Sequence, residues 1–148
     1  MKAPFLLGRL IFGGFFLYNG INHFKERRNM VKYVDQKNVL APELAVTGTG
    51  LALIVGGSSI LLGLKPKIGT ALVAGFLAAV SPVMHDFWRA EDPGQRTNDM
   101  INFSKNMALL GSALALMAVE EPWPGSVPVA QPGKLERMRR AFQRQIAA

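Results

Sequence analysis

The chain has 148 residues, enough for one domain, and 49% of them are apolar although 17 are lysine or arginine and the formal net charge is +7. The absence of cysteine excludes disulfides, thiol redox chemistry and cysteine-ligated iron–sulfur clusters. The apolar residues are segregated: residues 68–84 carry no charge, and the only polar side chains in residues 44–64 are hydroxyls. Runs of about 17 to 25 apolar residues match the hydrocarbon thickness of a bilayer. The sequence therefore predicts a membrane protein, and bases flanking its spans explain the positive charge better than nucleic-acid binding does.

The first apolar run predicts a helix over residues 4–24. A single lysine precedes it, as in a signal peptide, but no small-residue cleavage site follows. Asn19, Asn22 and His23 occupy the place where such a site would lie. We therefore expect a retained first span.

Two further helices are expected at residues 43–64 and 67–87. The link Lys65-Pro66-Lys67 is so short that they should form an antiparallel hairpin. Pro42 lies just before the helix expected at residues 43–64, and Glu43 suits its first turn. The preceding loop, residues 25–41, is long and basic with scattered apolar residues, which is typical of a short amphipathic helix on a membrane surface.

A fourth helix is expected at residues 98–119, after a polar loop with a Pro-Gly turn. Four prolines within residues 122–132 then exclude a regular helix. The last residues carry Leu135, Met138, Phe142 and Ile146 at helical spacing, with arginines on the other face. We predict an all-α, polytopic, up-and-down bundle of four transmembrane helices over residues 1–121. A Pro-rich linker and a basic amphipathic surface helix should follow over residues 122–148.

Small residues recur at the spacing that lets membrane helices approach closely. They form three sets: Gly48, Ala52 and Gly56; Ala71, Gly75 and Ala79; Gly111 and Ala115. Packing within the bundle is the simpler interpretation, and a seam with a second copy or a partner subunit is the alternative.

Antiparallel threading brings most membrane-proximal polar groups to one end of the bundle. Its candidate site residues are Asn19, Asn22, His23, His85, Asp86, Trp88, Asn102, Lys105 and Asn106. Polar groups within hydrocarbon are costly, so they should face inward and pair. One interpretation is a hydrogen-bonded plug that fixes helix register. The other is a pocket for a polar headgroup with an apolar tail, such as a quinone, in which His85 faces Asn102 and Lys105.

The two histidines admit a further hypothesis, because residues at similar depth on different helices can ligate haem or a metal. His23 and His85 both lie beside charged neighbours at a water interface, which favours ordinary hydrogen bonding, so we expect no metal site and no catalytic residue is assigned. Arg9 lies inside the first helix near the opposite face. We expect it to form an ion pair with Glu120.

Three segments together resemble the DoxX family of small bacterial membrane proteins. They are "GRLIFGGFFLYNGINHF", "HDFW" and "INFSKNMALLGSALAL", with a similar central hairpin, so that the likeness covers residues 4–119. The resemblance implies a four-helix bundle in the inner membrane and a link to redox processes, since members include the large subunit of thiosulfate:quinone oxidoreductase. The positions that match shared motifs are Arg9, Gly20, His23, His85, Asp86, Phe87, Trp88, Asn102, Lys105 and Asn106.

These observations predict a membrane subunit associated with a quinone-linked redox complex in the bacterial inner membrane, with a protein partner that carries the redox cofactor. The alternative is a non-enzymatic accessory or assembly subunit of a larger respiratory or photosynthetic complex. A transporter is disfavoured because no inverted repeat or broken midplane helix is evident. We expect the termini on the cytoplasmic face, although basic residues are nearly balanced between the two faces.

Overall fold

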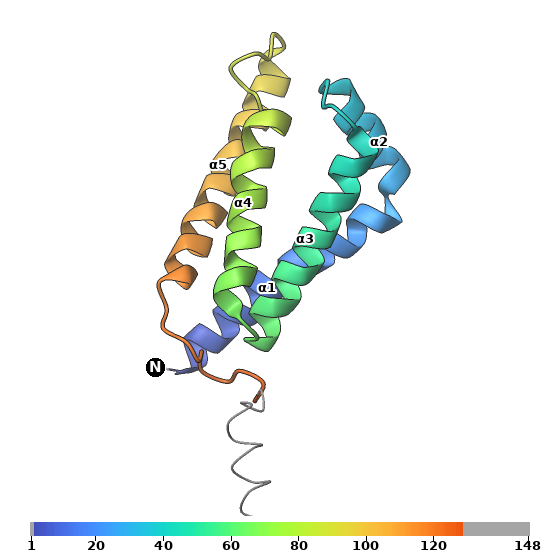
Figure 1. Ribbon diagram of the computed structural model, residues 1–148. Helices are drawn as coiled ribbons and strands as arrows, with labels where there is room; N and C mark the ends of the chain where they lie inside the picture. The colour runs from blue at the N-terminus through green and yellow to red at the C-terminus, as the bar shows by residue number, and fades with distance from the viewer. Residues whose placement is uncertain (1, 129–148) are drawn as a thin grey trace, which may run out of the picture.

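The computed structural model describes residues 2–128, and every regular element within them is a helix (Figure 1). The elements are α1 (Lys2–Lys25), α2 (Arg27–Gln36), α3 (Pro42–Leu62), α4 (Pro66–Met84) and α5 (Pro93–Met117). Each of the four predicted long helices is present, as is the short helix expected in the first loop. The predicted helix at the end of the chain lies outside the described residues.

Two helix ends differ from the prediction. The helix expected over residues 98–119 begins at Pro93, because the Asp92 carboxylate caps it by accepting from the Gln95 backbone N–H at 2.7 Å. The Pro-Gly pair that suggested a turn therefore forms the first turn of α5. α4 ends at Met84 rather than at residue 87, soon after Pro82, which supplies no backbone donor to the last turn.

Three helices are long and apolar enough to cross a membrane, over Ala3–Lys25, Pro42–Leu62 and Pro66–Met84. Large apolar side chains on their outer faces are exposed, including Leu7, Ile11, Leu44 and Val55. Such exposure would be costly in water and is expected against lipid. α5 is not among the three, because its first half is polar and only residues 107–117 are mainly apolar.

α1 and α3 pack through glycines that allow their backbones to touch. A Cβ atom on Gly57 would lie 2.5 Å from the Leu17 nitrogen, and one on Gly20 would lie 2.7 Å from the Ile54 nitrogen. Gly56 of α3 similarly abuts the carbonyl of Gly69 in α4. Close backbone approach at small residues is the usual basis of helix association in lipid.

The small-residue faces chosen from spacing are mostly not the packed ones. Among them Gly56 is buried, but Gly48, Gly75 and Gly111 have no atom within 4 Å of an added Cβ. The prediction that these stripes pack within the bundle is wrong for those three positions. Glycine and alanine occur on several faces of each helix, so spacing alone cannot select the face that meets a neighbour.

The predicted hairpin of α3 and α4 is confirmed, and its link is tightly fixed. α3 ends at Leu62 and is followed by Gly63, whose φ of 67° is left-handed, and the Ser59 hydroxyl donates to the carbonyl of Leu64 at 2.6 Å. Beyond α5 the chain folds under this hairpin, where the Val127 backbone N–H donates to the Leu62 carbonyl at 2.9 Å.

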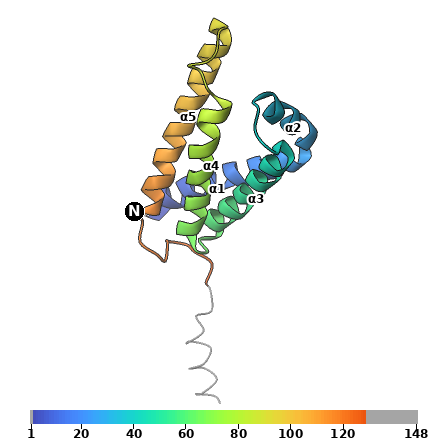
Figure 2. The ribbon, with the colours of Figure 1, turned by 45° about the horizontal axis from the view of Figure 1, so that its top comes forward.

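The buried core lies where all four long helices meet the segment after α5. It contains Phe16, Leu53, Ile60, Val73, Ala74, Leu77, Ala113 and Trp123. Trp123 lies beyond the predicted domain boundary at residue 121, yet it is 2% exposed and stacks edge-on against Phe5. Away from this core, α1 and α3 diverge from α4 and α5 toward the end that carries α2 (Figures 1 and 2).

Candidate functional site

A cavity of about 660 Å³ lies at the end of the molecule where α2 crosses. All five helices contribute to its wall, which is largely apolar and includes Phe16, Met30, Val46 and Phe76. Four of the predicted polar residues line it as well: Asn19, His23, His85 and Asn106. Its size and its few polar groups suit an amphipathic small molecule.

His23 is fixed on one wall by its own helix and by α3. Its Nδ1 donates to the Asn19 carbonyl at 2.8 Å, since a carbonyl can only accept. Gly50 leaves room for it, because a Cβ there would lie 2.9 Å from the His23 Cβ. The ring also meets Phe76 edge-on at 6.1 Å. Nε2 of His23 is thus left without a protein partner in the described residues.

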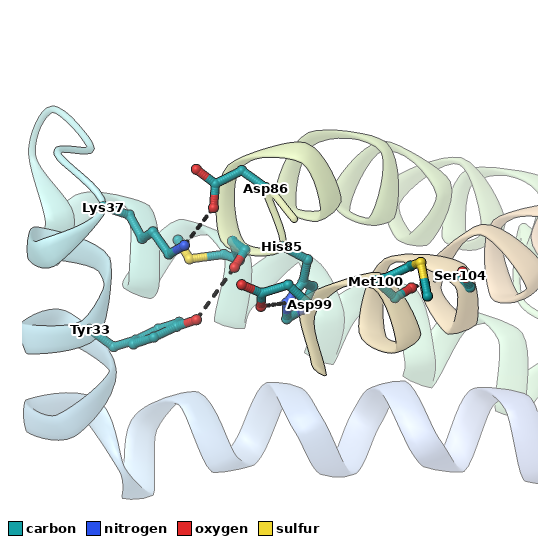
Figure 3. A network of polar contacts seen from close by, with 8 residues as sticks. Tyr33, Lys37, His85, Asp86, Asp99, Met100 and Ser104 are labelled. Atoms are coloured by element: carbon teal, nitrogen blue, oxygen red, sulfur yellow. Dashed lines mark hydrogen bonds and ion pairs between the residues drawn. The ribbon is translucent and has the colours of Figure 1, made fainter. Parts of the chain in front are cut away.

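His85, at the end of α4, is held by a carboxylate of α5. Its Nδ1 lies 3.3 Å from Oδ1 of Asp99, which is 7% exposed (Figure 3). Because Nδ1 makes this contact, the second ring nitrogen, Nε2, has no protein partner within residues 2–128, as for His23. Carboxylate–histidine pairs commonly fix the tautomer and orientation of an imidazole. Both histidines thus line the cavity with Nδ1 hydrogen-bonded and with no protein partner for Nε2 within residues 2–128.

A salt bridge joins the end of α2 to the end of α4 beside the cavity. Nζ of Lys37 lies 2.6 Å from Oδ1 of Asp86, and the two side chains are 16% and 20% exposed (Figure 3). The Tyr33 hydroxyl donates to the Met84 carbonyl at 3.4 Å. These two contacts attach α2 and the residue after it to the end of α4.

The salt bridge shifts both of its groups in the directions that favour charge. The hydrogen bond to Asp86 raises the pKa of Lys37 above its usual 10.5, against the opposing effect of burial. The hydrogen bond from Lys37 lowers the pKa of Asp86 below its usual 3.8. Both groups lie outside the candidate spans and are charged at neutral pH.

The remaining predicted site residues lie near this cavity but do not line it. Lys105 is exposed, Trp88 stacks with Phe87 and Phe103, and Asp86 is engaged by Lys37; Asn22 and Asn102 are half-buried. We expected His85 to face Asn102 and Lys105; its hydrogen-bond partner within residues 2–128 is Asp99. α5 starts five residues earlier than predicted, and the residue that meets His85 lies one turn nearer its start.

Three residues of this network were missed from sequence: Tyr33, Lys37 and Asp99. Asp99 precedes the stripe of Asn102 and Asn106 at helical spacing, so it could have been found by extending that stripe. Tyr33 and Lys37 lie in or just after α2, and no local pattern relates that segment to the end of α4.

Arg9 marks the opposite end of the molecule. It is 3% exposed, and its guanidinium donates to the carbonyls of Pro124 and Gly125, each at 2.9 Å. It forms no ion pair with Glu120 in the described structure, so the expected pair is replaced by two backbone contacts. Glu121, not Glu120, contacts a helix there, accepting from the Lys67 backbone N–H at the start of α4.

Within residues 2–128 no group of three or more His, Asp or Glu side chains is placed to hold a metal ion.

The fold and the long apolar helices define an integral membrane protein of the all-α class. The sequence profile of the DoxX family matches residues 5–86, more than half of the chain, and the protein belongs to that family. The matched region covers α1 to α4 and stops before α5. Neither the curated proteins nor the solved structures contain a match.

Proposed function

We propose that this DoxX-family protein is a membrane subunit of a quinone-linked redox complex and binds a quinone in the 660 Å³ cavity. The observation that carries the proposal is that His23 of α1 and His85 at the end of α4 line the same largely apolar cavity. A quinone has a flat apolar ring with two carbonyl oxygens and an isoprenoid tail. Two imidazole groups and an apolar cavity match that combination.

Because Nδ1 of each ring carries the proton given to its partner, Nε2 of a neutral ring would accept from a quinol hydroxyl, and Nε2 of a doubly protonated ring would donate to a quinone carbonyl oxygen. Each histidine is oriented through Nδ1, His23 by the Asn19 carbonyl and His85 by Asp99. A bound quinone supplies reversible electron and proton transfer. The chain's own contribution is to bind and orient the ring, to exclude water with its apolar wall, and to hold a proton at the imidazole of His85.

The proposal includes a four-span topology in the inner membrane, with α5 as the fourth span. α5 supports this by its 25-residue length and by its packing along α4, a candidate span. Four spans would place the start of α1 and the end of α5 on one face, which we propose is cytoplasmic. Reporter fusions before α1, between α4 and α5, and after α5 test this order; a fusion after α5 on the same face as the fusion between α4 and α5 would contradict it.

Quinone binding is tested on the full chain purified in a mild detergent. Bound quinone is extracted and identified by mass spectrometry, and a short-chain quinone is titrated against the protein. We expect His85→Ala to lower its affinity by about threefold to tenfold, as for the loss of one hydrogen bond. Lys105→Ala is the matched control, because Lys105 is exposed and does not line the cavity.

A steric pair sharpens the test. Ala79 lines the cavity and the adjacent Ala78 does not, although both are exposed on α4. Ala79→Phe should displace the ligand, and Ala78→Phe should leave binding unchanged. Absence of quinone from the wild type, or equal binding by both phenylalanine variants, would refute the proposal.

A further inference from the structure

The junction of α1 and α2 holds a second, strongly basic recess. It is a groove of about 630 Å³ formed by the chain from Phe24 to Lys32 and by Glu43 at the start of α3. Its bases are Lys25, Arg27, Arg28 and Lys32, and its two carboxylates are Glu26 and Glu43. The chain bends at Glu26, between the two helices, and this bend gathers bases from both helices around one hollow.

Only one of the four bases is neutralised within the groove. Arg27 contacts Glu43 at 3.0 Å, and Glu26 accepts a hydrogen bond from Asn29 at 2.8 Å. Lys25, Arg28 and Lys32 form no ion pair with any residue between 2 and 128. Arg28 and Lys32 are four positions apart on α2, so that two like charges stand on the same face. A bound anion would relieve that repulsion.

The position of the groove indicates which anion it meets. The candidate span of α1 ends at Lys25, so the groove begins where the apolar segment of that helix stops. Lipid phosphates lie at this level in either leaflet of a bilayer, so unpaired bases here lie beside headgroup phosphates on either face of the membrane. Phe24 is 41% exposed and lines the same groove, which places an apolar surface next to the unpaired bases. A free phosphate ion would make no use of that surface.

We propose that this groove binds an anionic phospholipid, with Lys25, Arg28 and Lys32 around the phosphate and Phe24 against the first part of an acyl chain. This site is independent of the quinone proposal, since none of these four residues lines the larger cavity. The lipid anchors the bend between α1 and α2. It thereby fixes the position of α2 relative to the membrane surface.

The full chain is purified in a neutral detergent, and phosphatidylglycerol binding is titrated by native mass spectrometry, with phosphatidylcholine as the zwitterionic comparison. The test variant combines Arg28→Gln with Lys32→Gln. The control combines Arg89→Gln with Arg96→Gln, which removes the same charge from exposed residues outside the groove. We expect the wild type to bind one phosphatidylglycerol tightly. The affinity for this lipid should fall by about tenfold or more in the test variant and by less than about twofold in the control.

Three results would overturn the proposal. An equal loss in both variants would show general attraction to a basic protein. Equal affinity for phosphatidylcholine would show that the phosphate charge is not recognised. Binding of inorganic phosphate as tight as that of the lipid, at constant ionic strength, would assign the groove to a free anion. All four substituted side chains are exposed, and circular dichroism verifies that both variants keep their helical content.

Discussion

Replacing Gly57 by alanine tests the contact on which the arrangement of α1 and α3 depends. The added Cβ would lie 2.5 Å from the Leu17 nitrogen and 2.8 Å from the Gly13 carbonyl oxygen, where ordinary contacts are 3.4–4 Å. Both atoms belong to the backbone of α1, so no side-chain rotation relieves the clash. The helices must separate by about 1 Å, and a gap of that size forfeits roughly a quarter to a half of the dispersion energy of the facing atoms.

The expected net loss follows from two opposing effects. Overpacking costs about 1–3 kcal/mol, and the better helix propensity of alanine returns about 1 kcal/mol. We expect Gly57→Ala to lower the free energy of unfolding by up to about 2 kcal/mol relative to the wild type, as much as roughly thirty-fold in the ratio of folded to unfolded protein, and by about 1–3 kcal/mol relative to Gly48→Ala, which gains the propensity without the clash. Gly48→Ala is the matched control on the same helix, because no atom lies within 4 Å of its added Cβ.

The assay is equilibrium unfolding in mixed micelles of a mild detergent and sodium dodecyl sulfate, followed by circular dichroism. Gly48→Ala should be as stable as the wild type or slightly more stable. If Gly57→Ala unfolded at the same detergent fraction as Gly48→Ala, the close packing of α1 on α3 would be refuted.

The remaining predictions concern the salt bridge, the buried arginine and the cavity wall. Asp86→Asn should lower the free energy of unfolding by about 1 kcal/mol at pH 7, as for a partly exposed pair. The pKa of Asp86 is lowered in the folded protein, so the difference in unfolding free energy between the wild type and Asp86→Asn should vanish as pH falls from 3.8 through the folded pKa of Asp86. The pKa of Lys37 is raised, so the same difference should also vanish as pH rises from 10.5 through the folded pKa of Lys37. A pH-independent difference would contradict the pairing. Arg9→Lys should lower the free energy of unfolding by about 1–3 kcal/mol in the same assay, because one ammonium group cannot reproduce the guanidinium fork that donates to two carbonyls. An unchanged unfolding midpoint would argue against a stabilising role for these two hydrogen bonds. Gly50→Ala should displace His23 and weaken quinone binding about threefold to tenfold in the titration. Unchanged affinity would show that His23 does not contact the ligand.

The gathering of polar groups at one end of the molecule could be predicted from sequence, but its pairings could not. Short links and helix lengths dictate which helix ends meet, and Asn19, His23, His85 and Asn106 line one cavity. A helix rotates its side chains by about 100° per residue, so a small error in register changes the partner. Asp99, not Asn102 or Lys105, therefore meets His85.

The sequence by itself determined the helical class, the membrane environment and the α3–α4 hairpin, because apolar run length and a proline link are local properties. It also predicted a short helix after α1, and that helix is α2. Only the tertiary structure decided which glycine faces pack, since several faces carry glycine and the choice is made by the neighbouring helix. The tertiary structure also decided the contacts of Lys37 with Asp86 and of Arg9 with the chain beyond α5. Each contact joins residues 49 or more positions apart, and no local sequence spacing predicts such a contact.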